Sequence, residues 1–207
     1  QRAWHAHWHL KHPAAQTDTN EPVTTEAFRL ITTRNMLFNR ALLDVVPSFD
    51  ESLSTGEDTD FAFRASQAGC EVLALPTLHV THWGEPATLR QYFRQQLWHA
   101  NRKAYATILA SSGGKAGANA IYYSIAFLIT LLIAILAPIA ALLVSPGYWL
   151  LLLPLLAVIA GPALLIASRA NSPILFLRLC VLYFLYGLAR AIDLLGLVPS
   201  KKTWKAR

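Results

Sequence analysis

Charged side chains are absent from a long internal stretch of this 207-residue chain. No Asp, Glu, Lys or Arg occurs from residue 119 to residue 168, and most of the side chains there are apolar. One crossing of a bilayer needs about 20 apolar residues, so this stretch is long enough for two. It holds no charged group that would line a path for ions or substrates, which argues against a transporter.

Cysteine is also scarce, with only Cys70 and Cys180, one in each part of the chain. Two such residues build neither a disulfide framework nor a paired zinc motif. This usage fits a reducing environment and a domain that faces the cytosol. The chain starts with Gln1 and has no signal peptide at that end, so we expect a C-terminal fragment of a longer protein.

The net charge of +6 is spread unevenly. Residues 1–118 hold eleven Lys or Arg and eleven of the twelve acids, so this part is nearly neutral and is expected to be soluble. The last 39 residues carry seven Lys or Arg against one acid, Asp193. Because the excess positive charge belongs to the membrane part, we expect contact with anionic lipid headgroups and not with nucleic acid.

The soluble part has a mixed pattern of apolar residues. Alternation predicts strands, helical spacing predicts helices, and Gly, Pro and Ser clusters separate them. The predicted strands cover 28–33, 70–75 and 78–81, and the predicted helices cover 39–46, 59–68 and 89 to about 110. Gly69 is expected to end the second helix and Thr88 to cap the third. Residues 111–118 read as a flexible linker.

Two membrane spans are predicted in the uncharged stretch, from about Asn119 to Val144 and from Trp149 to about Ser168. Ser145, Pro146 and Gly147 form the turn between them, so residues 119–168 make a two-helix hairpin. Pro138 marks a kink within the first span.

A third apolar segment, residues 173–198, contains Arg178, Arg190 and Asp193. An arginine near the middle of a span costs about 2.5–3.5 kcal/mol, so we favour a helix in the membrane interface over a third span. With two spans, the soluble part and the basic tail both lie inside, as the positive-inside rule prefers. With three spans the tail lies outside. Residues 173–207 are therefore either an interfacial or a third membrane helix, with a basic tail.

Three carboxylates fall within four residues in the run Gly56-Glu57-Asp58-Thr59-Asp60. A helix N-terminus stabilises negative charge through its free N–H groups and its dipole. Three acids so close together nevertheless repel one another, and one would suffice as a cap. Their number suggests an external task, such as accepting a proton or facing a cation. A capped surface helix on an unrelated domain is the alternative.

These acids belong to a longer ordered set: Phe49-Asp50-Glu51, the run from Gly56 to Asp60, Arg64, Ala68-Gly69, Pro76 and His82. The set resembles the acceptor-side half of an inverting family 2 glycosyltransferase with a GT-A fold, over roughly residues 25–110. The resemblance implies an α/β class, with residues 1–110 as the C-terminal part of a GT-A domain followed by transmembrane helices. The nucleotide-binding half is then expected before residue 1.

The resemblance assigns roles to the three acids. An inverting transferase needs a base near the acceptor hydroxyl, on the face opposite the departing nucleotide diphosphate. Asp58 matches the aspartate that has this role in the family's Glu-Asp pair. Glu57 either supports Asp58 as a base through like-charge proximity or faces solvent. Asp60 is a candidate substrate-binding residue, although we favour a structural role at the helix N-terminus.

The resemblance also implies a divalent metal, Mg²⁺ or Mn²⁺, on the diphosphate. In several enzymes with a GT-A fold a histidine near the position of His82 helps an Asp-x-Asp motif to hold that metal, and imidazole is a suitable ligand. The remaining ligands are expected before residue 1. An ordinary packed or exposed histidine is the alternative. The spacing of His5, His7, His9 and His12 fits no tetrahedral site.

The helix predicted from Leu89 has two interpretations. Arg94, Gln95 and Trp98 line the acceptor or diphosphate site in one, and the helix is a membrane-proximal amphipathic element in the other. Its apolar stripe would comprise Leu89, Phe93, Leu97 and Trp98. Cellulose and hyaluronan synthases carry Gln-x-x-Arg-Trp in a comparable place, whereas this chain has Arg94 and Leu97 at the first and fourth positions. That difference favours a single transfer over polymerisation.

Asn35, in a Thr-x-Asn turn similar to that of the family, is a candidate contact to sugar hydroxyls. Together these features predict a hexosyltransferase that moves a sugar from a nucleotide-sugar donor to a lipid-linked or cell-surface glycan by inverting single displacement. We expect a multi-pass protein of the inner or plasma membrane with a cytoplasmic soluble domain. The alternative is a non-catalytic membrane protein whose cytosolic domain binds a partner or glycan. Whether this stretch is active alone stays open.

Overall fold

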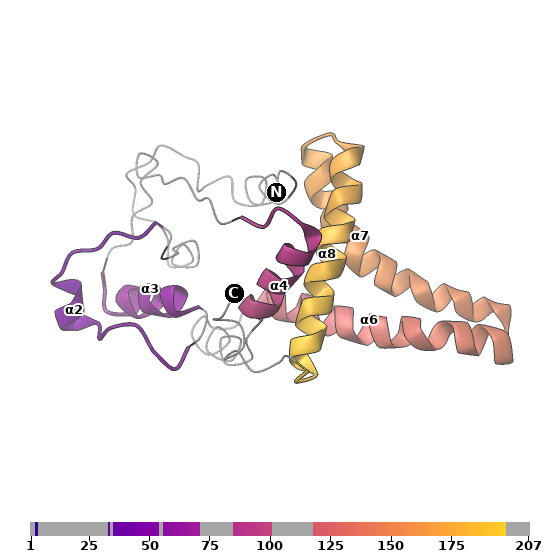
Figure 1. Cartoon of the computed structure of the whole chain (residues 1–207), viewed down its shortest axis with the longest axis horizontal. Helices are drawn as coiled ribbons and strands as arrows, with labels where there is room; N and C mark the ends of the chain where they lie inside the picture. The colour runs from indigo at the N-terminus through magenta and orange to yellow at the C-terminus, as the bar shows by residue number, and fades with distance from the viewer. Residues whose placement is uncertain are drawn as a thin grey trace. The chain divides into compact units, whose positions relative to one another are not determined.

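The structure is a computed structural model that describes residues 3, 33, 35–53, 56–70, 85–100 and 118–197. Every regular element in this described part is helical (Figure 1). The predicted strands at 28–33, 70–75 and 78–81 lie outside it, apart from Thr33 and Cys70, which are not in strands. The α/β class therefore stays an expectation. The linker at 111–117 and the tail at 198–207 also lie outside the described residues.

The chain divides into two compact units. One unit contains Gln1–Lys11, Pro86–Ala100 and Asn119–Arg207, and the other contains His12–Glu85 and Asn101–Ala118. The first, called the membrane unit below, holds α4 and all of the long apolar helices. The second, called the acid unit, holds α2, α3 and the three clustered carboxylates.

In the acid unit, α3 (Glu57–Gln67) is flanked at both ends by glycines in a left-handed conformation. Gly56 precedes it with a φ of 83°, a left-handed conformation that glycine adopts without steric cost. At the other end Gly69 has a φ of 79°, and the N–H of Cys70 donates to the carbonyl of Ala65 at 3.0 Å. This is a Schellman cap, so the predicted role of Gly69 is confirmed.

The core of the acid unit forms around Phe61, which is 1% exposed. Its ring lies 5.2 Å from that of Phe38 and 4.7 Å from that of Phe49. Val46, beyond α2 (Leu42–Val45), is buried in the same cluster. The α2 helix is shorter than the predicted range of 39–46, because the Asn39 side chain accepts a hydrogen bond from the N–H of Ala41 and forms a turn there.

In the membrane unit, α6 (Ala118–Leu143), the 3₁₀ segment η3 (Pro146–Leu152) and α7 (Leu153–Arg169) form the predicted hairpin (Figure 1). The Ser145 side chain accepts a hydrogen bond from Gly147 N–H in the turn. Trp149, the predicted start of the second helix, lies in η3, so the α-helix begins at Leu153. With proline at its start, the segment forms a tighter turn first.

Three segments of the described part are long and apolar enough to cross a membrane: Ala120–Leu143, Pro146–Arg169 and Pro173–Leu194. The third is α8 (Pro173–Leu194), which is the least apolar of the three. It ends at the same kind of cap as α3, since Gly196 has a φ of 74° and the N–H of Leu197 donates to the carbonyl of Ile192.

The remaining helix, α4 (Leu89–His99), starts as predicted. The Thr88 hydroxyl accepts from the N–H of Gln91, and the Gln91 side chain accepts from the N–H of Thr88, which is a capping box. The prediction that this helix continues to about residue 110 is wrong at its C-terminal end. Ala100 is extended, with a ψ of 117°, and is fully buried, so the helix ends at His99.

The apolar face predicted for α4 is also partly wrong. The buried residues are Tyr92, Gln96 and Leu97, whereas Leu89 and Trp98 are 54% and 42% exposed. The reason is tertiary, because α4 packs against α8 and the residues toward that partner are buried whatever their polarity. Burial among the side chains of α6 and α8 raises the pKa of Tyr92 above its ordinary value.

Candidate functional site

The first turn of α3 holds the candidate base. Asp58 is half-buried, and its two carboxylate oxygens have different partners. Its Oδ1 accepts from the N–H of Thr59 at 2.8 Å, and its Oδ2 accepts from the N–H of Thr33 at 3.1 Å. A carboxylate oxygen accepts more than one hydrogen bond, so both oxygens retain capacity for a further donor. The two backbone donors orient the carboxylate.

The hydrogen bond between Thr33 and Asp58 joins two stretches that the sequence analysis treated separately. Residues 33 and 58 are 25 positions apart, yet the turn before Asn35 is attached to the first turn of α3. Asn35 is half-buried. The structure thus brings together the Thr-x-Asn turn and the carboxylate that the resemblance had assigned to the acceptor site.

Asp60, the third acid, is engaged elsewhere. Its Oδ2 lies 2.8 Å from the Nε of Arg64, one helical turn later. The same guanidinium donates to the carbonyl oxygens of Pro47 at 2.6 Å and Ser48 at 3.0 Å. This pair ties α3 to the loop after α2. The contact supports the structural role that we favoured for Asp60, and its role toward substrate stays a prediction.

Arg64 is the residue that sequence reasoning undervalued. We had used it only as part of the resemblance, whereas its guanidinium joins α3 to the loop after α2. The signal was present, because Asp60 and Arg64 are four residues apart and opposite charges at that spacing meet on a helix. What no spacing rule indicates is the pair of loop carbonyls that complete the arrangement.

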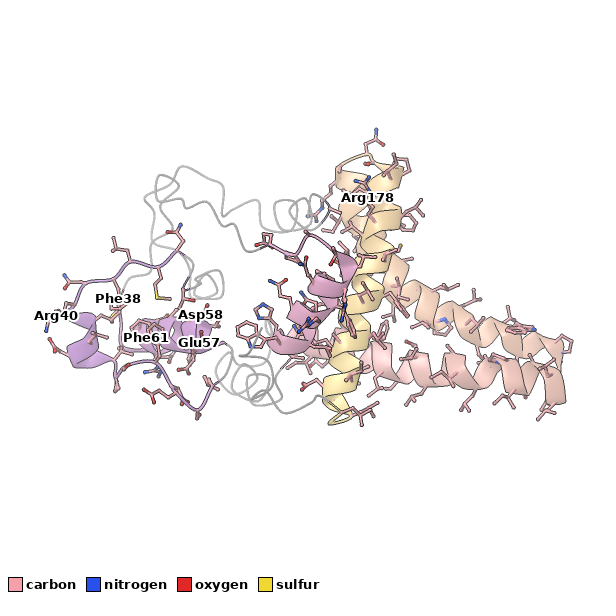
Figure 2. All side chains as sticks on the ribbon, viewed as in Figure 1. Phe38, Arg40, Glu57, Asp58, Phe61 and Arg178 are labelled. Atoms are coloured by element: carbon pink, nitrogen blue, oxygen red, sulfur yellow. The ribbon has the colours of Figure 1, made fainter. Side chains whose placement is uncertain are left out.

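Glu57 differs from both aspartates. It is half-buried, and among the described residues it has neither a hydrogen-bond partner nor an ion-pair partner. Figure 2 shows Glu57 and Asp58 at one end of α3, with Phe61 farther along the helix. The rigid aromatic cluster around Phe61 supports the turn that carries the two acids. The predicted pair of adjacent carboxylates is therefore present on a packed helix.

Arg94, Gln95 and Trp98 belong to α4 in the membrane unit, not to the acid unit. Arg94 is exposed, Gln95 is half-buried, and the Trp98 ring contacts that of His99 edge-on, with their centroids 4.8 Å apart. Their burial fits the amphipathic interpretation of this helix. Their proposed contact with substrate stays a prediction.

The metal prediction also stays untested. His82 and the N-terminal histidines lie outside the described residues. Within the ranges that the structure does describe, no group of three or more His, Cys, Asp or Glu side chains is arranged to hold a metal ion.

The described part of the membrane unit thus holds three segments that are long and apolar enough to cross a membrane, and the clustered carboxylates belong to the acid unit. A family model described as "Glycosyl transferase family group 2" matches residues 4–188, which is most of the chain. The chain therefore belongs to the family 2 glycosyltransferases, and glycosyl transfer from a nucleotide-sugar donor to an acceptor is the activity that such a domain implies. No match was found among the curated proteins or among the solved structures.

Proposed function

We propose that this protein transfers a hexosyl group from a nucleotide-sugar donor to a hydroxyl of a lipid-linked or cell-surface glycan, with inversion at the anomeric carbon. Membership of the family supports the transfer, and the long apolar helices suit an acceptor that is held at a membrane. We further propose that the acid unit is the acceptor side of an α/β GT-A domain and lies on the cytoplasmic side of the inner or plasma membrane.

Asp58 is the proposed base. The acceptor oxygen forms the new bond to the anomeric carbon while the bond from that carbon to the nucleotide diphosphate breaks. The proton of the acceptor hydroxyl passes to the Asp58 carboxylate. The single observation that carries this assignment is the hydrogen bond from Thr33 N–H to Asp58 Oδ2, because it places the carboxylate beside the turn that bears Asn35. Asn35 is then the proposed contact to the acceptor's other hydroxyls.

The other two acids have different proposed roles. Asp60 is occupied by Arg64, so it holds the loop in place. Glu57, beside Asp58 and without a protein partner in the described part, is available to contact the acceptor. A divalent metal, to which His82 would contribute, would stabilise the departing diphosphate. No step above depends on that metal. Arg94, Gln95 and Trp98 are proposed to face the substrate from α4.

The test compares two substitutions of equal size at neighbouring acids. In the intact protein, Asp58→Asn should reduce the rate of donor-dependent transfer by about 10²-fold or more, because the proton acceptor is lost. Binding of the nucleotide sugar should stay close to wild type. Asp60→Asn is the matched control, since it keeps the helix and the Asp58 carboxylate but weakens the bond to Arg64. Asp60→Asn should lower the melting temperature of the protein, while the rate of transfer at a temperature where the protein stays folded should remain close to that of the wild type.

Wild-type turnover by Asp58→Asn would overturn the assignment of the base. The second candidate function, a non-catalytic membrane protein that binds a glycan or a partner, gives a different result. Such a protein would bind glycan equally well with and without a nucleotide sugar, and no sugar would be released from the donor. Donor hydrolysis or transfer that disappears in Asp58→Asn excludes it.

A further inference from the structure

The α8 helix contacts the hairpin only near the hairpin's open end, as far as the described contacts extend. On α6 its partners lie in the first turns. The Tyr123 hydroxyl donates to the carbonyl of Tyr183 at 2.9 Å. Gly187 lies so close to Phe127 that a Cβ there would be 2.3 Å from the ring. These contacts join the start of α6 to the middle of α8.

On α7 the partners lie in the last turns. Ala163 and Ile166 share one buried cluster with Leu179 and Leu182 of α8. The start of α6 and the end of α7 are the two open ends of the hairpin. Figure 1 shows α8 running across these ends, with the rest of the hairpin extending away from it. At the closed end, by contrast, Leu142 is 82% exposed. A third span would instead run along the hairpin toward its closed end.

The α4 helix packs on the middle of α8 and turns a polar face away from it. Tyr92 of α4 lies in the same buried cluster as Leu179, Leu182 and Tyr183. The opposite face of α4 carries exposed Arg90, Gln91 and Arg94. If α8 crossed the bilayer, this helix would sit at mid-membrane with two exposed guanidinium groups, which is a costly position for charge.

The uncharged segment of α8 is also short for a helix that crosses a bilayer. Eleven residues separate Arg178 from Arg190. At 1.5 Å per residue they extend about 17 Å, which is roughly half of the hydrocarbon thickness of a bilayer. By comparison, the described part of α6 carries no charged side chain from end to end.

We propose that α8 lies along the membrane surface, at the same side as the open ends of the hairpin, and that lipid covers its outer face. That face is a continuous apolar strip with helical spacing, formed by Ile174 at 62%, Leu177 at 65% and Val181 at 45% exposed. Phe184, at 37%, lies at the end of the strip, where its ring meets that of Phe127 of α6 with their centroids 5.9 Å apart. Arg178 is exposed beside the strip, where a cationic head reaches lipid phosphates (Figure 2). Arg190 and Asp193 are instead buried, at 8% and 7% exposed.

The consequence is that the described part of the chain crosses the membrane twice, with α4 and α8 on one side. A lipid bilayer fits this strip because its interfacial region offers acyl chains for the apolar side chains and anionic headgroups for Arg178. The placement does not depend on the reaction proposed above, so the two can fail separately.

Depth measurements on the full chain test the proposal. Nitroxide labels are attached to Ile174→Cys, Val181→Cys and Phe184→Cys, each in a Cys70→Ala, Cys180→Ala background, in vesicles that contain anionic lipid. A surface helix gives three similar, shallow depths. A crossing helix gives a label at 184 that is much deeper than the label at 174. Ile135→Cys on α6 is the control and must be deep in either case.

Sidedness gives an independent result. In the same background, Thr203→Cys should not react with an impermeant thiol reagent that is added to intact cells. It should react once the membrane has been permeabilised. Tyr148→Cys, at the closed end of the hairpin, should react from the outside in intact cells. Reaction of both positions from the same side, or a depth gradient along α8, would overturn the proposal.

Discussion

The acid unit and the membrane unit place their side chains in opposite ways. In the acid unit α3 buries Phe61, Ala62 and Ala65, while its carboxylates are partly open to solvent. In the membrane unit α6 exposes large side chains such as Ile135, at 58%, although Phe127 near its start is fully buried. The buried residues in its second half are Ala134, Ala137 and Ala141. One unit has its apolar side chains inside, and the other has many of them outside.

This difference is the one expected of a chain in which water surrounds one unit and lipid surrounds part of the other. Water drives large apolar side chains into a core, so the acid unit is organised around an aromatic cluster. Lipid gives no such drive between helices, so large apolar side chains stay exposed in the membrane unit, and its buried cluster combines small residues such as Ala163 with large ones such as Leu179. Charge follows the same division. Asp60 and Arg64 pair where water reaches them, whereas Arg190 and Asp193 are buried in the protein.

The largest expected effect is on the core of the acid unit. Phe61→Ala removes the ring on which Phe38 and Phe49 pack, and a loss of this size costs about 3–5 kcal/mol of unfolding free energy. Because α3 carries Asp58, transfer should fall in parallel. Pulse proteolysis in urea on the intact protein measures the stability. Leu37→Ala, at a side chain that is 80% exposed, is the control and should change it by less than about 0.5 kcal/mol.

A matched pair of lysine substitutions tests the two-solvent comparison directly. Ile135 on α6 and Leu43 on α2 are both exposed, at 58% and 44%. Ile135→Lys should cost about 2.5–3.5 kcal/mol of insertion free energy, because a charge is placed within an apolar span. Leu43→Lys should be nearly neutral, because water surrounds it. A glycosylation assay of membrane insertion measures the first and urea unfolding the second. Equal tolerance of both changes would mean that α6 is not in lipid.

A pair of glycine substitutions sharpens the comparison within the membrane unit. Gly187→Ala places a methyl group against the Phe127 ring and should destabilise the contact between α6 and α8 by about 1–3 kcal/mol. Gly161→Ala, in α7, meets nothing within 4 Å and should be neutral or slightly stabilising. Thermal unfolding in detergent compares the two variants. Equal thermal stability of the two variants would mean that the close approach of Gly187 to Phe127 does not limit the packing of α6 on α8.

Local rules were enough for much of the fold. The uncharged stretch predicted the hairpin, and α6 starts within one residue of the expected position. Thr88 and Gly69 were predicted as helix boundaries and are confirmed, because a cap depends on a few neighbouring backbone groups. The family resemblance was confirmed by the match over residues 4–188. The cluster of acids at the start of α3 was likewise visible in the sequence.

Contacts between residues far apart in the sequence decided the features that local rules missed. The buried face of α4 depends on α8, nearly 100 residues later, so its periodicity alone pointed to Leu89 and Trp98 instead of Tyr92 and Gln96. The three acids of α3 look alike in sequence and are separated only by their partners.

The amino-acid sequence by itself determined the helix boundaries at Gly69 and Thr88 and the stretch apolar enough to cross a membrane twice, since capping and hydropathy act over a few residues. Only the tertiary structure decided that Asp60 binds Arg64, that Asp58 is tied to Thr33 and that α8 crosses the open end of the hairpin. Those outcomes join residues that are brought together by packing, and packing depends on the whole chain.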